Sequence, residues 1–298
     1  MMQVGILFGS LFYGHIADRY GRKPAALLAT ILEIVFIVSS AVIPELWMFL
    51  VFRFLIGTSV GGVILCFYVL IIELSGKSFR PYCIGLQELA LVIGYFILPM
   101  IAYAVRYWRQ LQLVTSVPWV ISVVLYFMIP ESPRWLITRG RKKEAIELLT
   151  RIAKKNKRPT DKVEAVVNQM YDDSIHNKEQ QATYLDLFKT PKIRKYTVIM
   201  SLIWMCTAAV FFGVNQYIGR LEGNLYLNVM IAASSLFVGL VLVVIATLYF
   251  KRKVSVITSF CTAAVSLLVF LFVPFSLQAV YLTFAIVGQL GAYTAFVQ

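Results

Sequence analysis

The sequence predicts an all-α fold in which helices cross a membrane several times, as a multipass bundle. The chain is 59% hydrophobic and only 14% charged, whereas soluble domains are about a quarter charged. Its apolar residues form long blocks with no amphipathic spacing, and its basic residues gather between those blocks. A very large soluble core is the less favoured alternative.

Nine apolar blocks are long enough to cross a bilayer, because a helical span needs about 17 or more residues. They cover residues 2–17, 25–43, 46–70, 82–104, 110–129, 196–217, 225–249, 254–273 and 279–298. A polar stretch separates the first five blocks from the last four. We therefore expect an N-terminal transmembrane bundle in 1–129, a linker in 130–195 and a C-terminal transmembrane bundle in 196–298.

The net charge of +13 is explained by membrane topology. If the loop after the first block is cytoplasmic and the spans alternate, all but four basic residues fall on the cytoplasmic side or in its linker. The exceptions are Arg53, Arg106, Arg109 and Arg220. Lys and Arg are enriched in cytoplasmic loops of membrane proteins. We therefore expect the lipid bilayer, and no nucleic acid, as a partner, with residues 130–195 in the cytoplasm.

No group of residues indicates an enzyme, a metal site or a cofactor. His15 and His176 are isolated, and no Ser/His/Asp arrangement occurs in the spans. The four cysteines lie singly in or beside the apolar blocks, without the spacing of metal ligands or of a disulfide framework.

The linker is predicted to contain an amphipathic helix. Ala145, Leu148, Leu149 and Ile152 recur at helical spacing. Basic residues lie elsewhere around the helix, namely Lys142, Lys143, Arg151, Lys154 and Lys155. Such a helix lies on the bundle or on the membrane, partly through anionic lipid, or it is a solvated linker helix. Pro191 is expected to end any helix that precedes the sixth span.

The stretch "GHIADRYGRK" (14–23) is predicted to form a tight turn between the first two spans. Gly14 and Gly21 permit close approach and unusual backbone dihedrals. Asp18 can accept hydrogen bonds from the N-terminus of the next helix. The basic residues of this turn, which stay on the wet side, are Arg19, Arg22 and Lys23.

This stretch resembles the signature loop between the second and third helices of major facilitator transporters. "RFLIGTSVGG" (53–62), "PESPRWL" (130–136) and "GNLYLN" (223–228) resemble the organic cation, anion and carnitine transporter family of that superfamily. The resemblance covers nearly the whole chain and implies two helical bundles around a central cavity that works by alternating access. It aligns the chain with the second to about the tenth helix. We therefore expect an incomplete bundle of about nine transmembrane helices, from a fragment, a splice product or a truncated gene model.

The C-terminal half departs from the family's pattern at two positions. "LYFKRK" (248–253) stands where the family repeats a turn of the D-R-x-G-R type, and it lacks both the acid and the glycine. "LFV" (236–238) stands where a glutamate-x-proline is usual. We expect a C-terminal gate without these charges.

Two charges inside predicted spans are expected to meet. A charge in the bilayer usually has a partner or lines a watery cavity. Glu33 and Arg53 differ in depth by about 5 Å, at 1.5 Å per helical residue, and we predict an intramembrane pair between them. The alternative places Arg53 in the cavity with Glu33 neutral or reaching the interface. Arg53 begins a stripe that continues through Gly57, Gly61, Ile64 and Tyr68, and its G-x-x-x-G permits close helix contact.

The substrate-binding candidates lie on three spans. The resemblance implies that Tyr68 lies in the substrate site and that Phe211 and Phe212 occupy positions which line it. Trp204 and Asn215 share a helical face with Phe211, and Glu88 could attract an organic cation, carry a proton or reach the interface. Aromatic faces stabilise cations by about 0.5–2 kcal/mol each. The alternative for the aromatic residues is ordinary helix packing.

A set of charged residues is predicted to form an inner gate. Its members are Asp18, Arg22, Glu73, Arg80, Glu131 and Arg134. Related transporters use such clusters to bias one of two states by a few kcal/mol, and single exposed pairs contribute little. The alternative is that these charges only set the topology.

These observations predict a plasma-membrane carrier of small organic ions, either cations or carnitine-like zwitterions, without covalent catalysis. Two alternatives remain open. One is a sugar-type carrier of the same superfamily, although the seventh helix lacks the paired glutamines of such carriers. The other is a non-transporting chain that associates with a full-length transporter.

Overall fold

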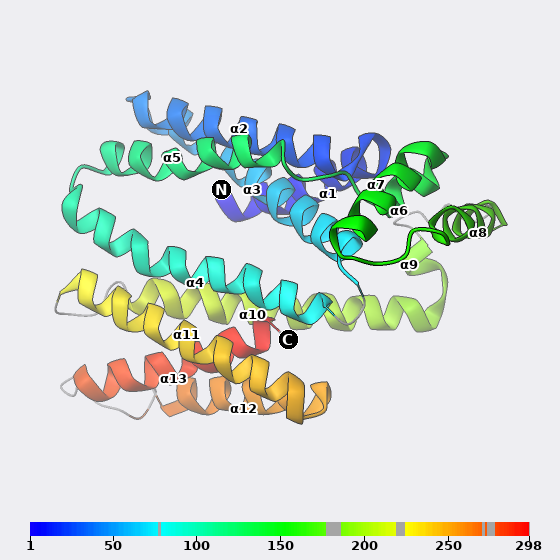
Figure 1. The fold of residues 1–298 in the computed structure, drawn as a ribbon. Coiled ribbons are helices and arrows are strands. Elements are labelled where there is room, and N and C mark those ends of the chain that lie inside the picture. The colour runs from blue at the N-terminus through cyan, green and yellow to red at the C-terminus, as the bar shows by residue number, and fades with distance from the viewer. Residues whose placement is uncertain (77–78, 177–185, 219–223, 270–271, 273–277, 298) are drawn as a thin grey trace. The chain divides into compact units, whose positions relative to one another are not determined.

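The computed structural model describes residues 1–76, 79–176, 186–218, 224–269, 272 and 278–297, and all regular structure in this part is helical (Figure 1). Nine helices of 18 or more residues occur there, one in each predicted span. They are α1 (Met2–Tyr20), α2 (Arg22–Val42), α3 (Leu46–Leu74), α4 (Arg80–Ala104), α5 (Trp108–Tyr126), α10 (Pro191–Ile218), α11 (Leu225–Tyr249), α12 (Arg252–Val269) and α13 (Gln278–Val297). The shorter helices are α6 (Pro133–Thr138), α7 (Lys142–Lys155), α8 (Val163–His176) and α9 (Asp186–Lys189).

Six of the long helices are apolar enough over sufficient length to cross a membrane, namely α2, α3, α4, α10, α11 and α13. The apolar part of α12, Lys253–Val269, is shorter. In α1 the mean hydropathy is lowered by glycine and polar residues. In α5 it is lowered by Arg109, Gln110 and Gln112 near the start of the helix. The prediction of an all-α multipass membrane bundle is confirmed.

The helices pack into two compact units. The first comprises Met1–Cys83 with Val105–Gln181, and the second comprises Ile84–Ala104 with Ala182–Gln298. Most of α4 therefore packs with the second unit, although the sequence-based division placed it in 1–129. Val92 of α4 is buried in the same core as Phe211 and Leu236, which explains this grouping.

In the first unit, α1 lies against α3, and α2 lies against both α3 and α5. Glycines on both helices allow the α1–α3 contact. A Cβ atom added at Gly5 or Gly9 would overlap the backbone of α3, and one added at Gly57 or Gly61 would overlap the backbone of α1. The G-x-x-x-G predicted on α3 is therefore one side of a contact whose other side is supplied by α1.

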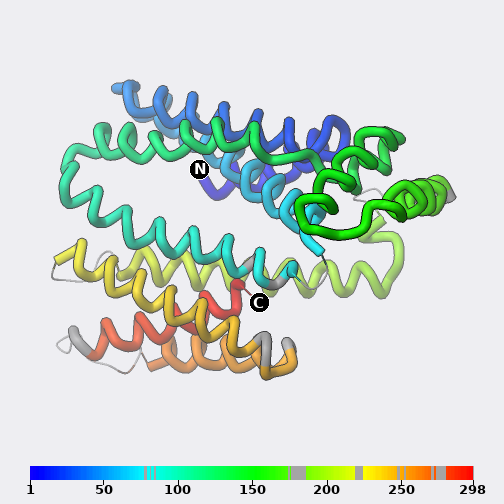
Figure 2. The backbone as a smooth tube through the Cα atoms, viewed as in Figure 1, coloured from blue at the N-terminus to red at the C-terminus, as the bar shows by residue number. Residues whose placement is uncertain are grey.

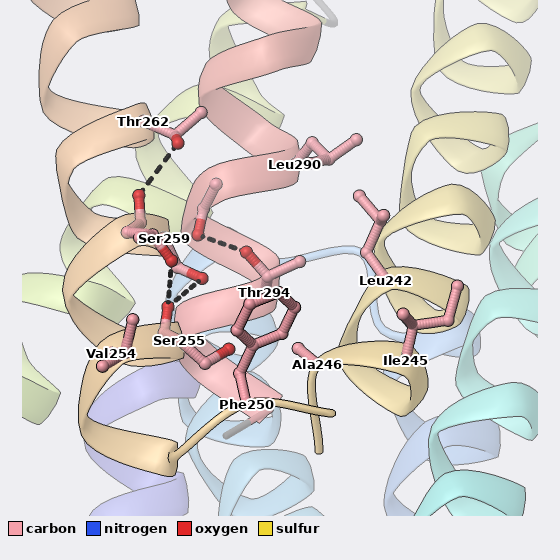
Figure 3. Close-up of a pocket in the computed structure, with 12 residues that line it drawn as sticks. Leu242, Ile245, Ala246, Phe250, Val254, Ser255, Ser259, Thr262, Leu290 and Thr294 are labelled. Carbon is pink, nitrogen blue, oxygen red and sulfur yellow. Dashed lines mark hydrogen bonds between the residues drawn. The ribbon is translucent and has the colours of Figure 1, made fainter. Parts of the chain in front are cut away.

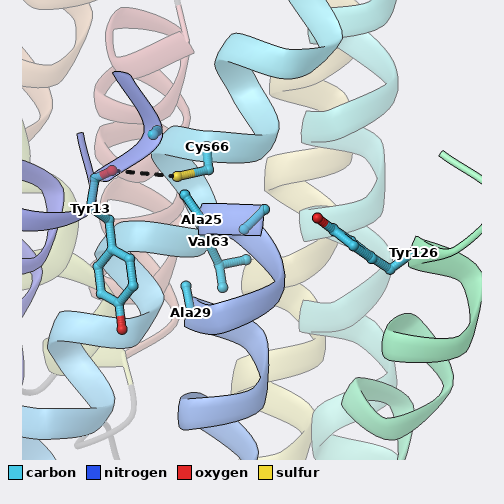
Figure 4. Close-up of a cluster of buried hydrophobic side chains, with 8 residues drawn as sticks. Tyr13, Ala25, Ala29, Val63, Cys66 and Tyr126 are labelled. Carbon is cyan, nitrogen blue, oxygen red and sulfur yellow. Dashed lines mark hydrogen bonds between the residues drawn. The ribbon is translucent and has the colours of Figure 1, made fainter. Parts of the chain in front are cut away.

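The core of the first unit is built from small side chains on α2 (Figure 4). Ala25, Ala26 and Ala29 are fully buried, and Tyr13 of α1 and Val63 of α3 pack against them. Alanine side chains let neighbouring helices approach closely, as in other membrane bundles.

Helices α6, α7 and α8 form a small cluster with its own apolar core, and α7 confirms the predicted amphipathic helix. Ala145 of α7 is buried, and Leu148 and Leu149 pack beside it against Trp135 of α6 and Val167 of α8. The apolar face of α7 is thus covered by its two neighbours. α9 ends at Lys189 and α10 begins at Pro191, a favoured first residue of a helix.

In the second unit α13 is the central helix, since α10, α11 and α12 each pack against it. Figure 2 shows the red tube of α13 running beside the orange tube of α12. The core contains Phe211, Leu240, Ala263 and Tyr293. α4 adds Val92 to this core.

Candidate functional site

The turn between α1 and α2 is made by a single residue. Gly21 has a φ of 118°, a conformation that L side chains rarely adopt. A Cβ atom at this position would also overlap the Glu131 carboxylate. Gly14 lies inside α1, which continues to Tyr20. The prediction that Gly14 helps to make the turn is therefore wrong.

The N-terminus of α2 is capped by Glu131 and not by Asp18. One carboxylate oxygen of Glu131 accepts hydrogen bonds from the backbone N–H groups of Arg22 and Lys23, both at 3.1 Å. A negative charge there also complements the partial positive charge of the helix end. The capping role predicted for Asp18 is wrong, because this residue belongs to the last turn of α1.

Arg22 joins two of the predicted acids. Its Nη1 atom is 2.7 Å from Oδ1 of Asp18 and its Nε atom is 3.2 Å from Oε2 of Glu73. The same guanidinium donates to the carbonyl of Ala17 at 2.8 Å. Together with Glu131, these contacts link α1, α2, α3 and the segment after α5. We call Asp18, Arg22, Glu73 and Glu131 the charge cluster.

Among the described residues, the side chains of the other basic residues predicted for the inner gate or the turn make no ion pair with the charge cluster. Arg134 is exposed, and Nε of Arg80 is buried without a hydrogen-bond partner among the described residues. Lys23 lies over the ring of Tyr126, with 5.1 Å to the centroid, and Arg19 lies over the ring of Tyr20 at 5.5 Å.

Sequence reasoning missed two residues that join α6 to the end of α1. The indole Nε1 of Trp135 donates to the carbonyl of Asp18 at 2.9 Å, and Nη2 of Arg139 donates to the same oxygen. "PESPRWL" was recognised as a motif, but the partner of its tryptophan lies 117 residues away. No local pattern indicates such a contact.

Glu33 and Arg53 do not form the predicted pair. Glu33 is only 2% exposed, and its Oε2 atom has no hydrogen-bond partner among the described residues. Arg53 instead lies over the ring of Phe49 on its own helix, with 4.9 Å to the centroid. A pair requires two side chains at similar depth in the membrane. Similar depth alone does not make the side chains point toward each other.

The second unit gathers three of the predicted aromatic residues. Phe211 is 4% exposed and stacks on Phe296 of α13, with 5.4 Å between centroids and 16° between the ring planes. Trp204 packs edge-on against the same Phe296 at 5.1 Å. Phe212 packs edge-on against Phe211 at 5.4 Å and is 37% exposed.

Polar groups lie close to these rings. The Tyr293 hydroxyl donates to the Glu88 carboxylate at 3.3 Å, and the Tyr293 ring is 6.1 Å from that of Phe211. The Asn215 side chain donates to the carbonyl of Phe211 at 2.8 Å and accepts from Gln289 at 2.9 Å. Gln289, which is fully buried, accepts in turn from Ser235 at 3.2 Å.

Five of the six substrate-binding candidates thus lie in the second unit, around α13. Tyr68 lies on α3 of the first unit and is 39% exposed. Sequence reasoning missed Gln289, Tyr293 and Phe296. Their spacing of four and three residues places them on one helical face, and this pattern could have indicated them.

A separate cavity of about 300 Å³ opens between α11, α12 and α13 (Figure 3). Most of the hydroxyl groups in its lining bond to their own helices. Ser259 donates to the carbonyl of Ser255, Thr262 to that of Thr258 and Thr294 to that of Gly291. Among the described residues, no group of three or more His, Cys, Asp or Glu side chains could hold a metal ion.

The helices form a bundle of the major facilitator fold, as solved structures of that superfamily show. A solved structure of the proton:xylose symporter XylE of this superfamily matches with a TM-score of 0.80 and 18% identity, over 99% of this chain and 70% of that chain. A partially occluded inward-open structure of XylE from E. coli matches with a TM-score of 0.76, 18% identity and the same shares of both chains.

The family model "Sugar (and other) transporter" matches residues 1–219, and the chain belongs to this family. An organic cation transporter protein of Drosophila melanogaster is 29% identical over 99% of this chain and 55% of its own length. Solute carrier family 22 member 1 of Bos taurus is 32% identical over 99% of this chain and 52% of its own length. The predicted resemblance to organic cation transporters is confirmed. The chain spans about half the length of these curated relatives.

Proposed function

We propose that the chain carries small organic ions across a membrane by alternating access, with organic cations or carnitine-like zwitterions as substrates. The observation that carries this proposal is the Glu88 carboxylate, held by Tyr293 beside a group of aromatic rings. The similarity to a protein named as an organic cation transporter supports the substrate class.

A carboxylate among aromatic rings suits a cation that has few hydrogen-bond donors. Aromatic faces attract such a cation by about 0.5–2 kcal/mol each, more when water is excluded. Glu88 supplies the compensating charge, and the amide groups of Asn215 and Gln289 can bind polar parts of the substrate. Tyr68 on α3 is a further substrate-binding candidate.

We propose that the charge cluster stabilises one of the two states of the carrier. Arg22 bonds to acids on α1 and α3 at once, so movement between these helices breaks at least one contact. A few kcal/mol suffices to shift a two-state equilibrium. On the positive-inside rule this end of the helices and residues 130–195 face the cytoplasm. We propose the plasma membrane as the membrane in which the chain resides.

Radiolabelled uptake in cells that express the tagged chain tests the proposal, with surface biotinylation as the measure of delivery. The probes are tetraethylammonium, carnitine and xylose, supplied separately. We expect uptake of one of the first two probes above that of untransfected cells, and a loss of about tenfold in Glu88→Gln, equivalent to about 1.4 kcal/mol. Glu164→Gln on α8 is the matched control and retains uptake.

Three results would contradict the proposal. Xylose uptake alone would favour the sugar-type carrier. Surface delivery without uptake of any probe, together with altered uptake by a co-expressed full-length relative, would favour the non-transporting partner. Equal uptake by Glu88→Gln and the original chain would remove Glu88 from the substrate site.

A further inference from the structure

Glu33 is a carboxyl group buried inside the first unit with no hydrogen-bond partner for its Oε2 atom among the described residues. It lies 11 residues after the start of α2, so it is about 16 Å along a span at 1.5 Å per residue. The side chain is only 2% exposed. An ionised carboxylate in such surroundings is strongly disfavoured, because burial removes it from bulk solvent and no described basic side chain pairs with it.

The three helices packed against α2 offer no cation to Glu33. On α3 the only basic residue is Arg53, which lies over Phe49. The other titratable residues of α3 are Cys66, Tyr68 and Glu73. On α1 the titratable residues are Tyr13, His15, Asp18, Arg19 and Tyr20. On α5 they are Arg109 and Tyr126, at opposite ends of the helix.

Tyr13 of α1 packs in the same core as Ala25, Ala26 and Ala29 of α2, and Ser59 of α3 is a further buried polar side chain of this unit. Tyr13 and Ser59 are almost fully buried, at 2% and 0% exposed. The surroundings of Glu33 are therefore polar but uncharged. They suit a neutral carboxylic acid, which can donate and accept hydrogen bonds, better than an anion.

We propose that Glu33 is a proton-binding site within the membrane, occupied by a proton while α1, α2 and α3 pack as they do here. Release of the proton leaves a carboxylate on α2 and transfers the proton to water. The carboxylate then favours arrangements of the three helices that admit water or a cation. The site is independent of the candidate substrate site, and the proposal does not depend on which solute is carried.

The pH dependence of stability is the first test, on the whole chain purified in detergent micelles. Because the folded state favours the protonated acid, its contribution to stability is full below the ordinary pKa of an unfolded glutamate, about 4.3, and is lost progressively as pH rises above that value. We expect the unfolding midpoint of the original chain to fall by about 3–5 °C between pH 6 and pH 9, relative to Glu33→Gln. Glu33→Gln imitates the neutral acid and does not titrate, so the two midpoints should differ less at pH 6 than at pH 9. Glu144→Gln, on exposed α7, should keep the original profile.

The second test is chemical modification by dicyclohexylcarbodiimide, which reacts with protonated carboxyl groups in apolar surroundings. This test uses the original chain and needs no variant. Mass spectrometry at pH 6 should find Glu33 modified and Glu144 unmodified, with modification of Glu33 decreasing as pH rises. Parallel pH profiles for the original chain and Glu33→Gln would overturn the proposal. The modification test still decides if Glu33→Gln fails to fold. In that case, absence of modification at Glu33 at pH 6 would overturn the proposal.

Discussion

The carboxylate of Glu131 bonds to the backbone N–H of Arg22, which precedes it by 109 residues. This contact ties the segment after α5 to the beginning of α2. The same carboxylate bonds to the N–H of Lys23, so two N–H groups at a partly buried helix end are satisfied by one distant side chain.

Replacing Glu131 with alanine should therefore destabilise the first unit. Loss of a charged cap typically costs about 1–2 kcal/mol, which lowers the thermal unfolding midpoint measured in detergent. Glu144→Ala removes an exposed acid whose pair with Arg141 is worth little, and it should leave the midpoint almost unchanged. Equal midpoints for both variants would contradict the capping role.

Gly21→Ala should also lower the midpoint, because alanine is strained at a φ of 118° and its Cβ atom displaces the Glu131 carboxylate. We expect a loss of about 1–3 kcal/mol. The double variant Gly21→Ala with Glu131→Ala should lose less than the sum of the two single losses, because the side chain that meets the new Cβ atom is gone. If the stability losses of the two single variants simply add in the double variant, backbone strain alone explains the loss in Gly21→Ala.

The contact between α1 and α3 predicts a severe effect of Gly61→Ala. The added methyl group meets the backbone of α1, which no rotamer change can relieve, so the helices must separate. We expect a loss of the monodisperse folded peak in size-exclusion chromatography in detergent. Gly94→Ala on α4, where nothing lies within 4 Å, is the matched control and should retain the peak.

The helices were predictable because their signal is local. A long apolar block must become a helix in lipid, where every backbone polar group needs an internal partner. The sequence also indicated the glycines of α3, but the facing glycines of α1, Gly5 and Gly9, follow only from the packed structure. The placement of α4 with the second unit depends on distant contacts such as those of Val92, and composition does not reveal it.

The site was predictable only in part, for the same reason. Residue type and motif identified Arg22, Glu73 and Glu131 as members of a charge cluster, but not which group each would bond. Asp18 was the nearest acid to the start of α2 in the sequence, yet Glu131 caps that helix. Glu33 and Arg53 were matched by depth alone, whereas a pair also requires side chains that face each other.

Two acids that share Arg22 should differ in their contribution to stability. The Asp18 side chain is 69% exposed, so its pair is screened and Asp18→Ala should cost at most about 1 kcal/mol. The Glu73 side chain is 10% exposed, and Glu73→Ala leaves a mostly buried guanidinium with less compensation, at a cost of about 3 kcal/mol or more. Urea denaturation of the two variants in detergent compares these losses. A larger loss for Asp18→Ala would contradict this ranking.

Alanine variants of the adjacent Phe211 and Phe212 on α10 should distinguish a side chain that packs in the core from one that contacts substrate. Phe211 is 4% exposed and stacks on Phe296, so Phe211→Ala opens a cavity and should cost about 3–5 kcal/mol. Phe212 is 37% exposed, and Phe212→Ala should leave the amount of folded protein nearly unchanged. Fluorescence-detected chromatography measures this amount, and Phe211→Leu should restore much of it by refilling the space.

If Phe212→Ala alone impairs probe uptake at normal surface delivery, Phe212 contacts substrate while Phe211 supports the fold. Equal loss of folded protein in both alanine variants would show that the two rings pack alike.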